Sequence, residues 1–105
     1  MYNKRRTYYE DDDFAISLEE LSGQLFVHLA IFKASKRVIT KAKEIWQEIQ
    51  DKCYWLGYEQ INTYTTEMRV VSFFKGWERL GEFEKDGKHY EVARWVLKSP
   101  LDLSP

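Results

Sequence analysis

The sequence predicts a mixed α/β (α+β) fold with the element order β-β-α-β-α-β-β, and three observations lead to it. Apolar residues alternate with small ones over residues 14–18, which is the period of a strand. Apolar residues recur every three or four positions over residues 38–56, as on one face of a long helix. Asp86-Gly87 is a strong signal for a two-residue hairpin turn late in the chain.

The first two strands are predicted to form an antiparallel hairpin. Leu21-Ser22-Gly23 has the composition of a turn, and it follows the alternating strand directly. Residues 24–32 are nearly all apolar, which indicates a central strand that is buried on both faces. We therefore expect Phe26 to be buried between this strand and the long helix, together with Ile45 and Ile49.

The long helix has both of its ends marked in the sequence. Ser35 can cap a helix that begins at Lys36, because its hydroxyl can accept a hydrogen bond from a free backbone N–H. Gly57 suits the left-handed position just past the helix end. The predicted buried stripe consists of Val38, Ala42, Ile45, Ile49, Cys53 and Leu56.

The second half of the chain contains a strand, a short helix and a hairpin. Residues 58–64 have strand propensity, and the helix before them makes a crossover that places this strand parallel to the central one. Thr66 can cap a helix over residues 67–75, with Gly76 as its stop, and residues 77–85 and 88–98 flank the Asp86-Gly87 turn. In an alternative assignment, the second helix continues to Leu80 and ends at Gly81.

Length and composition indicate one small domain. The chain has 105 residues and 44% hydrophobic residues, enough for a single core. We expect a flexible arm over residues 1–12, a domain over residues 13–98, and a tail over residues 99–105, where both prolines lie. Seventeen aromatic residues exceed what a small core easily hides, yet we assign at least two of Trp55, Trp77 and Trp95 to the core.

Charge and cysteine content exclude several function classes. A net charge of -1 excludes a bulk electrostatic nucleic-acid binder, so nucleic acid is not an expected partner. The single cysteine, Cys53, excludes an internal disulfide and a cysteine-rich metal site. The two histidines, His28 and His89, are too far apart in sequence for a common metal-site spacing, so no metal is expected. Because no targeting or membrane-spanning stretch is visible, we expect a cytoplasmic protein with no membrane partner.

Residues 24–97 resemble the C-terminal two-thirds of the GNAT superfamily, the acyl-CoA-dependent N-acetyltransferases. Residues 25–35 (LFVHLAIFKAS) are similar to the family's central strand running into its cofactor helix, and residues 73–98 are similar to its closing segment. Gly76-Trp77 then occupies the family's Gly-aromatic position. The pattern is closest to small, degenerate GNAT-like proteins of tailed phages, which implies a host cytoplasm. The resemblance also implies a sheet that lacks the family's N-terminal strand and helices, so that the acceptor pocket is half missing unless a second copy or a partner completes it.

The resemblance places any acetyl-CoA phosphate site at the start of the long helix. The cofactor-binding candidates there are Lys33, Ser35, Lys36 and Arg37. Lys36 and Val38 stand where the family has small residues, so the glycine cradle for the phosphate is lost. A basic patch remains at the start of the helix. The alternative interpretation is that these basic side chains are only solvated and bind no phosphate.

The resemblance also indicates which residues would carry catalysis. The family's general-acid tyrosine on the second helix is replaced by Phe73 or Phe74, and Tyr64 is a substitute candidate. His28 on the central strand is the candidate base, because a neutral imidazole accepts a proton near pH 7. For both residues the alternative is a packing role alone. Asn62 is expected to hydrogen-bond across splayed strands, as polar residues at this place do in the family.

Two functional hypotheses follow from the sequence. The first is a catalytically degenerate GNAT-like protein that needs no cofactor and acts by binding a host or virion protein. An acidic partner surface is favoured, because the start of the long helix is basic, and homo-oligomerisation is a further option. The alternative hypothesis is a minimal acetyl-CoA-dependent N-acetyltransferase.

Overall fold

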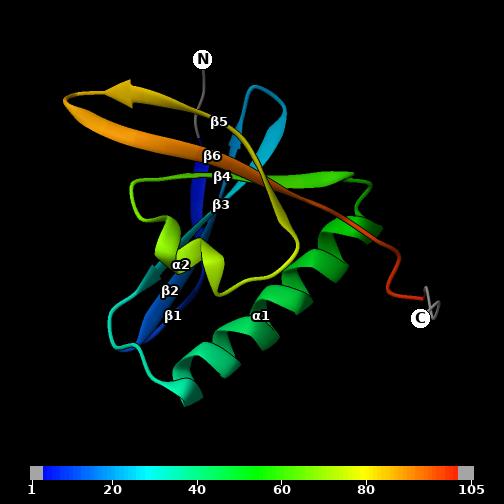
Figure 1. Ribbon diagram of the computed structural model, residues 1–105. Coiled ribbons are helices and arrows are strands. Elements are labelled where there is room, and N and C mark those ends of the chain that lie inside the picture. The colour runs from blue at the N-terminus through cyan, green and yellow to red at the C-terminus, as the bar shows by residue number, and fades with distance from the viewer. Residues whose placement is uncertain (1–3, 102–105) are drawn as a thin grey trace.

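The computed structural model describes residues 4–101 of the chain. Six strands and two helices follow one another along residues 4–101. Their order is β1 (Lys4–Glu10), β2 (Phe14–Leu21), β3 (Gln24–Ile31), α1 (Lys36–Trp55), β4 (Gln60–Thr65), α2 (Met68–Ser72), β5 (Trp77–Lys85) and β6 (Lys88–Val96). The strands form one mixed sheet in the order β1-β2-β3-β4-β6-β5. Figure 1 shows α1 and α2 on one side of β4, while the β5–β6 hairpin projects away from them.

The β2–β3 hairpin and both ends of α1 confirm the sequence predictions, whereas Leu56, predicted in the buried stripe, lies just past the last helical residue and is 74% exposed. Leu21 pairs with Gln24 across a two-residue turn, in which Ser22 and Gly23 have φ angles of 53° and 77°. Helix α1 begins where predicted, because Ser35 Oγ accepts a hydrogen bond from the Val38 backbone N–H at 3.2 Å. Gly57 follows the helix with a φ of 97°.

Strand β1 corrects the predicted arm over residues 1–12 and the predicted absence of an N-terminal strand. Residues 4–10 pair with β2 in an antiparallel ladder that includes Arg5 opposite Glu19 and Thr7 opposite Ser17. The strand was missed because its charged residues obscure the alternation, although Thr7, Tyr8 and Tyr9 have good strand propensity. Residues 1–3 of that arm, and residues 102–105 of the predicted tail, lie outside the described part of the chain.

The second half of the chain follows the main prediction, with a correction at α2. Strand β5 begins at Trp77, so the alternative assignment that extends the helix to Leu80 is wrong. Helix α2 is shorter than predicted and has no side-chain cap hydrogen bond. The predicted cap at Thr66 is wrong because Thr65 turns the chain instead, its Oγ1 accepting a hydrogen bond from the Glu67 N–H at 2.9 Å. The Asp86-Gly87 turn is confirmed, with φ angles of 54° and 75°.

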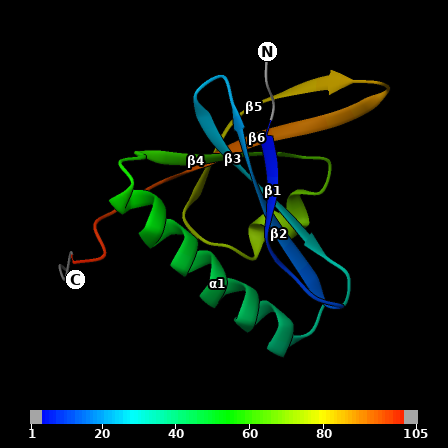
Figure 2. The same cartoon turned by 180° about the vertical axis from the view of Figure 1, so that it is seen from behind.

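The core lies between one face of the sheet and both helices. Trp95 of β6 occupies its centre, with its ring 4.8 Å from that of Trp46 in α1. The Trp95 indole N–H donates to the backbone carbonyl of Phe74, just after α2. Both helices therefore pack against the same sheet face, and no helix within residues 4–101 covers the opposite one (Figures 1 and 2).

The position of Phe26 corrects a second prediction. Leu25 and Val27 belong to the core beside α1, whereas Phe26 lies opposite Glu19 on the other sheet face. In a strand that is apolar on both faces, apolar and polar residues do not alternate. The strand's own composition therefore does not show on which face of the sheet Phe26 lies. Ile49 is 1% exposed, as predicted, and Ile45 is half-buried. Of the tryptophans, Trp95 is buried and Trp77 packs on the core, while Trp55 is 63% exposed.

Replacing Ile49 with alanine should lower the free energy of unfolding by about 2–5 kcal/mol, through lost apolar burial and the cavity that remains. Denaturant melts followed by far-UV circular dichroism measure this loss. Lys43→Ala on the exposed side of α1 is the control, and it should change stability by less than about 0.5 kcal/mol. Equal effects of the two changes would contradict the assigned helix orientation.

Candidate functional site

The helix-free face of the sheet, called the open face below, carries the candidate site. Strand register brings side chains from β1, β2, β3 and β4 together there, because residues paired across strands share a face. Arg5 and Phe26 each lie directly opposite Glu19, and Phe26 is also paired with Asn62 in β4. His28 and Tyr64 stand two residues further along their strands, so all of these side chains point to the open face.

Glu19 is the centre of this site, although it lies on the open face. Its side chain is only 2% exposed, and a buried carboxylate is costly unless it is paired. The Tyr64 hydroxyl donates to Glu19 Oε1 at 3.0 Å, and His28 Nε2 lies 2.8 Å from the same oxygen. The Arg5 guanidinium adds an ion pair at 3.7 Å. The two candidate catalytic residues of the sequence analysis are thus brought together by a third residue.

The electrostatics of the site keep both candidate residues neutral at pH 7. Burial lowers the pKa of His28, and the hydrogen bond to Glu19 offsets this effect only in part. Burial also raises the pKa of Tyr64, with a further contribution from its hydrogen bond to Glu19. A carboxylate only accepts hydrogen bonds, so the neutral His28 ring carries its proton on Nε2 and keeps Nδ1 as an acceptor. The arrangement thus offers a base and a phenol donor on either side of one carboxylate.

A groove of ≈ 530 Å³ extends along the open face from this cluster towards the β5–β6 turn. Its aromatic wall is continuous, since Tyr64 is in ring contact with Phe26 at 5.6 Å and with Tyr90 at 5.9 Å, and Phe83 stacks on Tyr90 at 5.0 Å. Arg5 and Lys85 add positive charge to the lining, and Asp86 adds one negative charge. Aromatic rings beside cations favour a ligand that has both apolar and anionic groups.

The junction between β3 and β4 is open and is bridged by side chains. Phe26 and Asn62 form the one register pair recorded for this parallel contact within residues 4–101. Asn62 Nδ2 donates to the Leu25 carbonyl at 3.3 Å, and Thr63 Oγ1 donates to the Val27 carbonyl at 2.7 Å. The expected cross-strand role of Asn62 is therefore confirmed. In a closely paired parallel ladder, backbone N–H groups of β4 would donate to β3 carbonyls. Here side chains of β4 donate to two of these carbonyls instead.

The basic start of α1 lies apart from this site. Lys33, Lys36 and Arg37 are exposed, and none of them lines the open-face groove. The hydroxyl oxygen of Ser35, a predicted phosphate ligand, accepts the capping hydrogen bond, which leaves its O–H as the donor. The loop N–H groups of Phe32 and Lys33 donate to the Asp13 carbonyl at 2.8 and 3.1 Å. The backbone before the helix is thus partly occupied by hydrogen bonds within the chain.

Sequence reasoning missed Glu19 and Arg5. The two-residue turn at Ser22-Gly23 fixes the register of β2 against β3, so the placement of Glu19 diagonally across from His28 was derivable from the sequence. Arg5 had no comparable signal, because strand β1 itself was not predicted.

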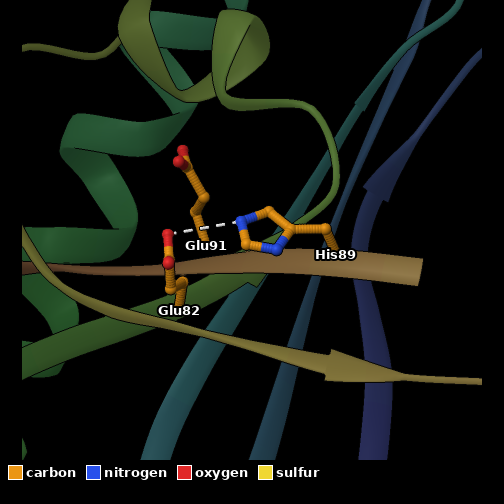
Figure 3. Close-up of side chains that lie close together, drawn as sticks. All are labelled: Glu82, His89 and Glu91. Carbon is orange, nitrogen blue, oxygen red and sulfur yellow. Dashed lines mark ion pairs between the residues drawn. The ribbon is translucent and has the colours of Figure 1, made fainter. Parts of the chain in front are cut away.

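Three potential metal ligands also gather elsewhere in the fold. The nitrogen or oxygen atoms of Glu82, His89 and Glu91 lie within 4.8 Å of one another on the β5–β6 hairpin (Figure 3). The sequence expectation of no metal rested on the separation of the two histidines and on the single cysteine, whereas the fold joins His89 to two glutamates.

Comparison with known proteins gives no assignment. No protein-family model matches the chain, and no curated protein matches it. Neither described helix is long and apolar enough to span a membrane.

Lowering the pH should destabilise the protein through His28. The folded pKa of His28 lies below its ordinary value, so between these two values the unfolded chain binds more protons than the folded chain. The free energy of unfolding should therefore fall as the pH drops through about 6.5, the ordinary histidine pKa. His28→Gln keeps a hydrogen-bond donor for Glu19 and does not titrate, so it should flatten this dependence. Arg5, Tyr64 and Glu19, which face the imidazole, are unchanged in that variant.

Denaturant melts from pH 8 to pH 5 measure the effect. His89→Gln is the matched control, because it removes the other, exposed histidine and should leave most of the slope in place. An identical pH slope for wild type and His28→Gln would contradict the assignment.

Proposed function

We propose that the protein is a catalytically silent, GNAT-like binding module that captures a protein segment in the groove of its open face. The observation that carries the proposal is the aromatic wall of Phe26, Tyr64, Phe83 and Tyr90 on a sheet face without a helix. Phe83 is 39% exposed, and aromatic side chains of this kind commonly anchor protein interfaces.

The chemistry of the groove favours an acidic segment with apolar side chains. Arg5 and Lys85 line the groove, and both can pair with carboxylates at the edge of an interface. The exposed Lys33, Lys36 and Arg37 offer a second basic surface to the same partner. The resemblance to small proteins of tailed phages suggests a host or virion protein as that partner, met in the host cytoplasm.

A second candidate function is a minimal N-acetyltransferase, and one observation favours it. His28 and Tyr64 are the residues that the family resemblance suggested as base and acid, and both contact Glu19. Lys36 and Val38 still replace the small residues of the phosphate loop. The binding module is therefore the preferred proposal.

Selection from a displayed library of random peptides tests the binding module. Acidic peptides that contain apolar residues should be enriched on the wild-type protein, and their affinity should fall with rising salt, because exposed charges are screened. Phe83→Ala and Tyr90→Ala should each weaken these peptides by more than about tenfold, as interface anchors do. Fluorescence anisotropy at two salt concentrations measures the affinities.

Trp55→Ala is the matched control for this experiment. It removes an exposed aromatic ring at the end of α1, away from the groove, and should leave peptide affinity unchanged. The proposal fails if no peptide is enriched, or if the selected peptides bind Phe83→Ala as tightly as the wild type.

Acetyl-CoA should show no binding at micromolar concentrations in a calorimetric titration, because the phosphate loop has lost its small residues. A 1:1 isotherm that disappears when Lys36 and Arg37 are both changed to Glu would instead support the acetyltransferase. Lys43→Glu is a control for the altered charge of the helix, because Lys43 is exposed on α1 and does not line the hollow beside Lys36 and Arg37.

A further inference from the structure

We propose that Glu82, His89 and Glu91 form a site for a first-row divalent transition metal such as Zn²⁺. The inference is independent of the binding function proposed above, because it concerns the face of the β5–β6 hairpin that lies opposite the groove. Phe83 and Tyr90 line the groove, and their chain neighbours Glu82, His89 and Glu91 point the other way, as alternation along a strand requires.

The three side chains are positioned by the hairpin itself. Glu82 lies directly opposite Glu91 in the antiparallel register, and His89 is two residues before Glu91 on the same face of β6. Figure 3 shows the His89 ring pointing towards the Glu82 carboxylate, with the Glu91 carboxylate beside them. A regular ladder closed by the two-residue Asp86-Gly87 turn holds this arrangement, so the ligands do not depend on a long loop.

The spacing of the donor atoms fits tetrahedral coordination. Two ligands bound about 2.0–2.1 Å from Zn²⁺ at a tetrahedral angle lie ~3.3 Å apart. The distance from His89 Nε2 to Glu82 Oε2 is 3.3 Å. Glu91 completes the set within 4.8 Å, and its side chain is 32% exposed, so it has room to rotate closer. Three protein ligands would leave a fourth position for water.

The two carboxylates of this cluster attract positively charged groups. Two carboxylates directly opposite each other on a sheet repel, which destabilises the hairpin unless a positive group lies between them. Arg79 supplies that group, with its Nη2 atom 2.5 Å from Glu82 Oε2 and 3.7 Å from Glu91 Oε1. Arg79 and a metal ion would therefore compete for the same two carboxylates.

A backbone irregularity places Arg79 in this position. Residues three apart on a regular strand point to opposite faces, yet Arg79 contacts Glu82. The register of β5 against β6 shifts between Arg79 and Gly81, and this bulge turns both side chains to the same face. Arg79 is 47% exposed, so its guanidinium can move into solvent when a metal binds.

The donor set also selects the kind of metal. An imidazole with two carboxylates suits Zn²⁺ and its first-row neighbours, whereas Mg²⁺ and Ca²⁺ prefer oxygen ligands alone. Calorimetric titration of the full chain with ZnCl₂ in chelator-free buffer should give a 1:1 isotherm, and MgCl₂ should give none. His89→Ala should weaken Zn²⁺ binding by more than about tenfold. Even residues that only hydrogen-bond to a metal ligand commonly change metal affinity by about tenfold when they are replaced.

Competition by Arg79 gives the sharpest test. Arg79→Gln should tighten Zn²⁺ binding, because the competing cation is removed from both carboxylates. Lys88→Gln is the matched control, because it removes the same charge from the exposed turn of the same hairpin and should have a smaller effect. The chain has only two histidines, so Zn²⁺ should shift the ring NMR signals of His89 and leave those of His28 in place.

Three results would overturn the inference. They are the absence of Zn²⁺ binding, equal affinity for wild type and His89→Ala, and Zn²⁺-induced shifts at His28 but not at His89. All variants change exposed side chains, and circular dichroism verifies that each one folds.

Discussion

The parallel contact between β3 and β4 is the constraint on which the rest of the molecule depends. It joins two antiparallel halves, β1-β2-β3 and β4-β6-β5, and α1 is the crossover that connects them. The contact has one recorded register pair, whereas β4 and β6 share six. Side chains replace part of the missing ladder, because Asn62 and Thr63 donate to carbonyls of β3. Buried polar bonds of this kind fix one arrangement of two halves that apolar packing alone would hold less specifically.

The polar groups at this junction continue across the open face. Gln60 Nε2 donates to Asn62 Oδ1 at 2.8 Å, and Arg94 Nη1 donates to Gln60 Oε1 at 3.1 Å. Arg94 also forms an ion pair with Glu78 on the edge strand β5. On the other side of the junction, Glu19 gathers His28 and Tyr64. The open face thus combines a hydrogen-bonded polar network with an aromatic groove.

The β5–β6 hairpin serves two different surfaces because successive residues of a strand point to opposite faces. Phe83 and Tyr90 extend the groove, while Glu82, His89 and Glu91 form a charged cluster behind them. The hairpin projects beyond both helices, so neither surface is covered by the core elements (Figure 2). A hairpin of two nine-residue strands can therefore present aromatic side chains on one face and a cluster of carboxylates and an imidazole on the other.

The sequence by itself determined the features that depend on near neighbours. The Ser35 cap, the apolar stripe of α1 and the two hairpin turns involve residues a few positions apart, so their patterns are readable along the chain. The parallel crossover followed from the handedness and length of a strand-helix-strand unit. The two-residue turn of the β2–β3 hairpin also fixes the strand register, and this register places Glu19 opposite Phe26.

Only the tertiary structure decided the features that depend on contacts between distant segments. Strand β1 exists because β2 offers it an edge, and its own charged sequence predicts no strand. The meeting of Arg5 and Tyr64 at the Glu19 carboxylate follows from the pairing of strands outside the β2–β3 hairpin. The cluster around Arg79 depends on a one-residue bulge that no local pattern marks. These contacts form where burial and charge pairing outweigh local propensity, and that balance is set by neighbours in space rather than in sequence.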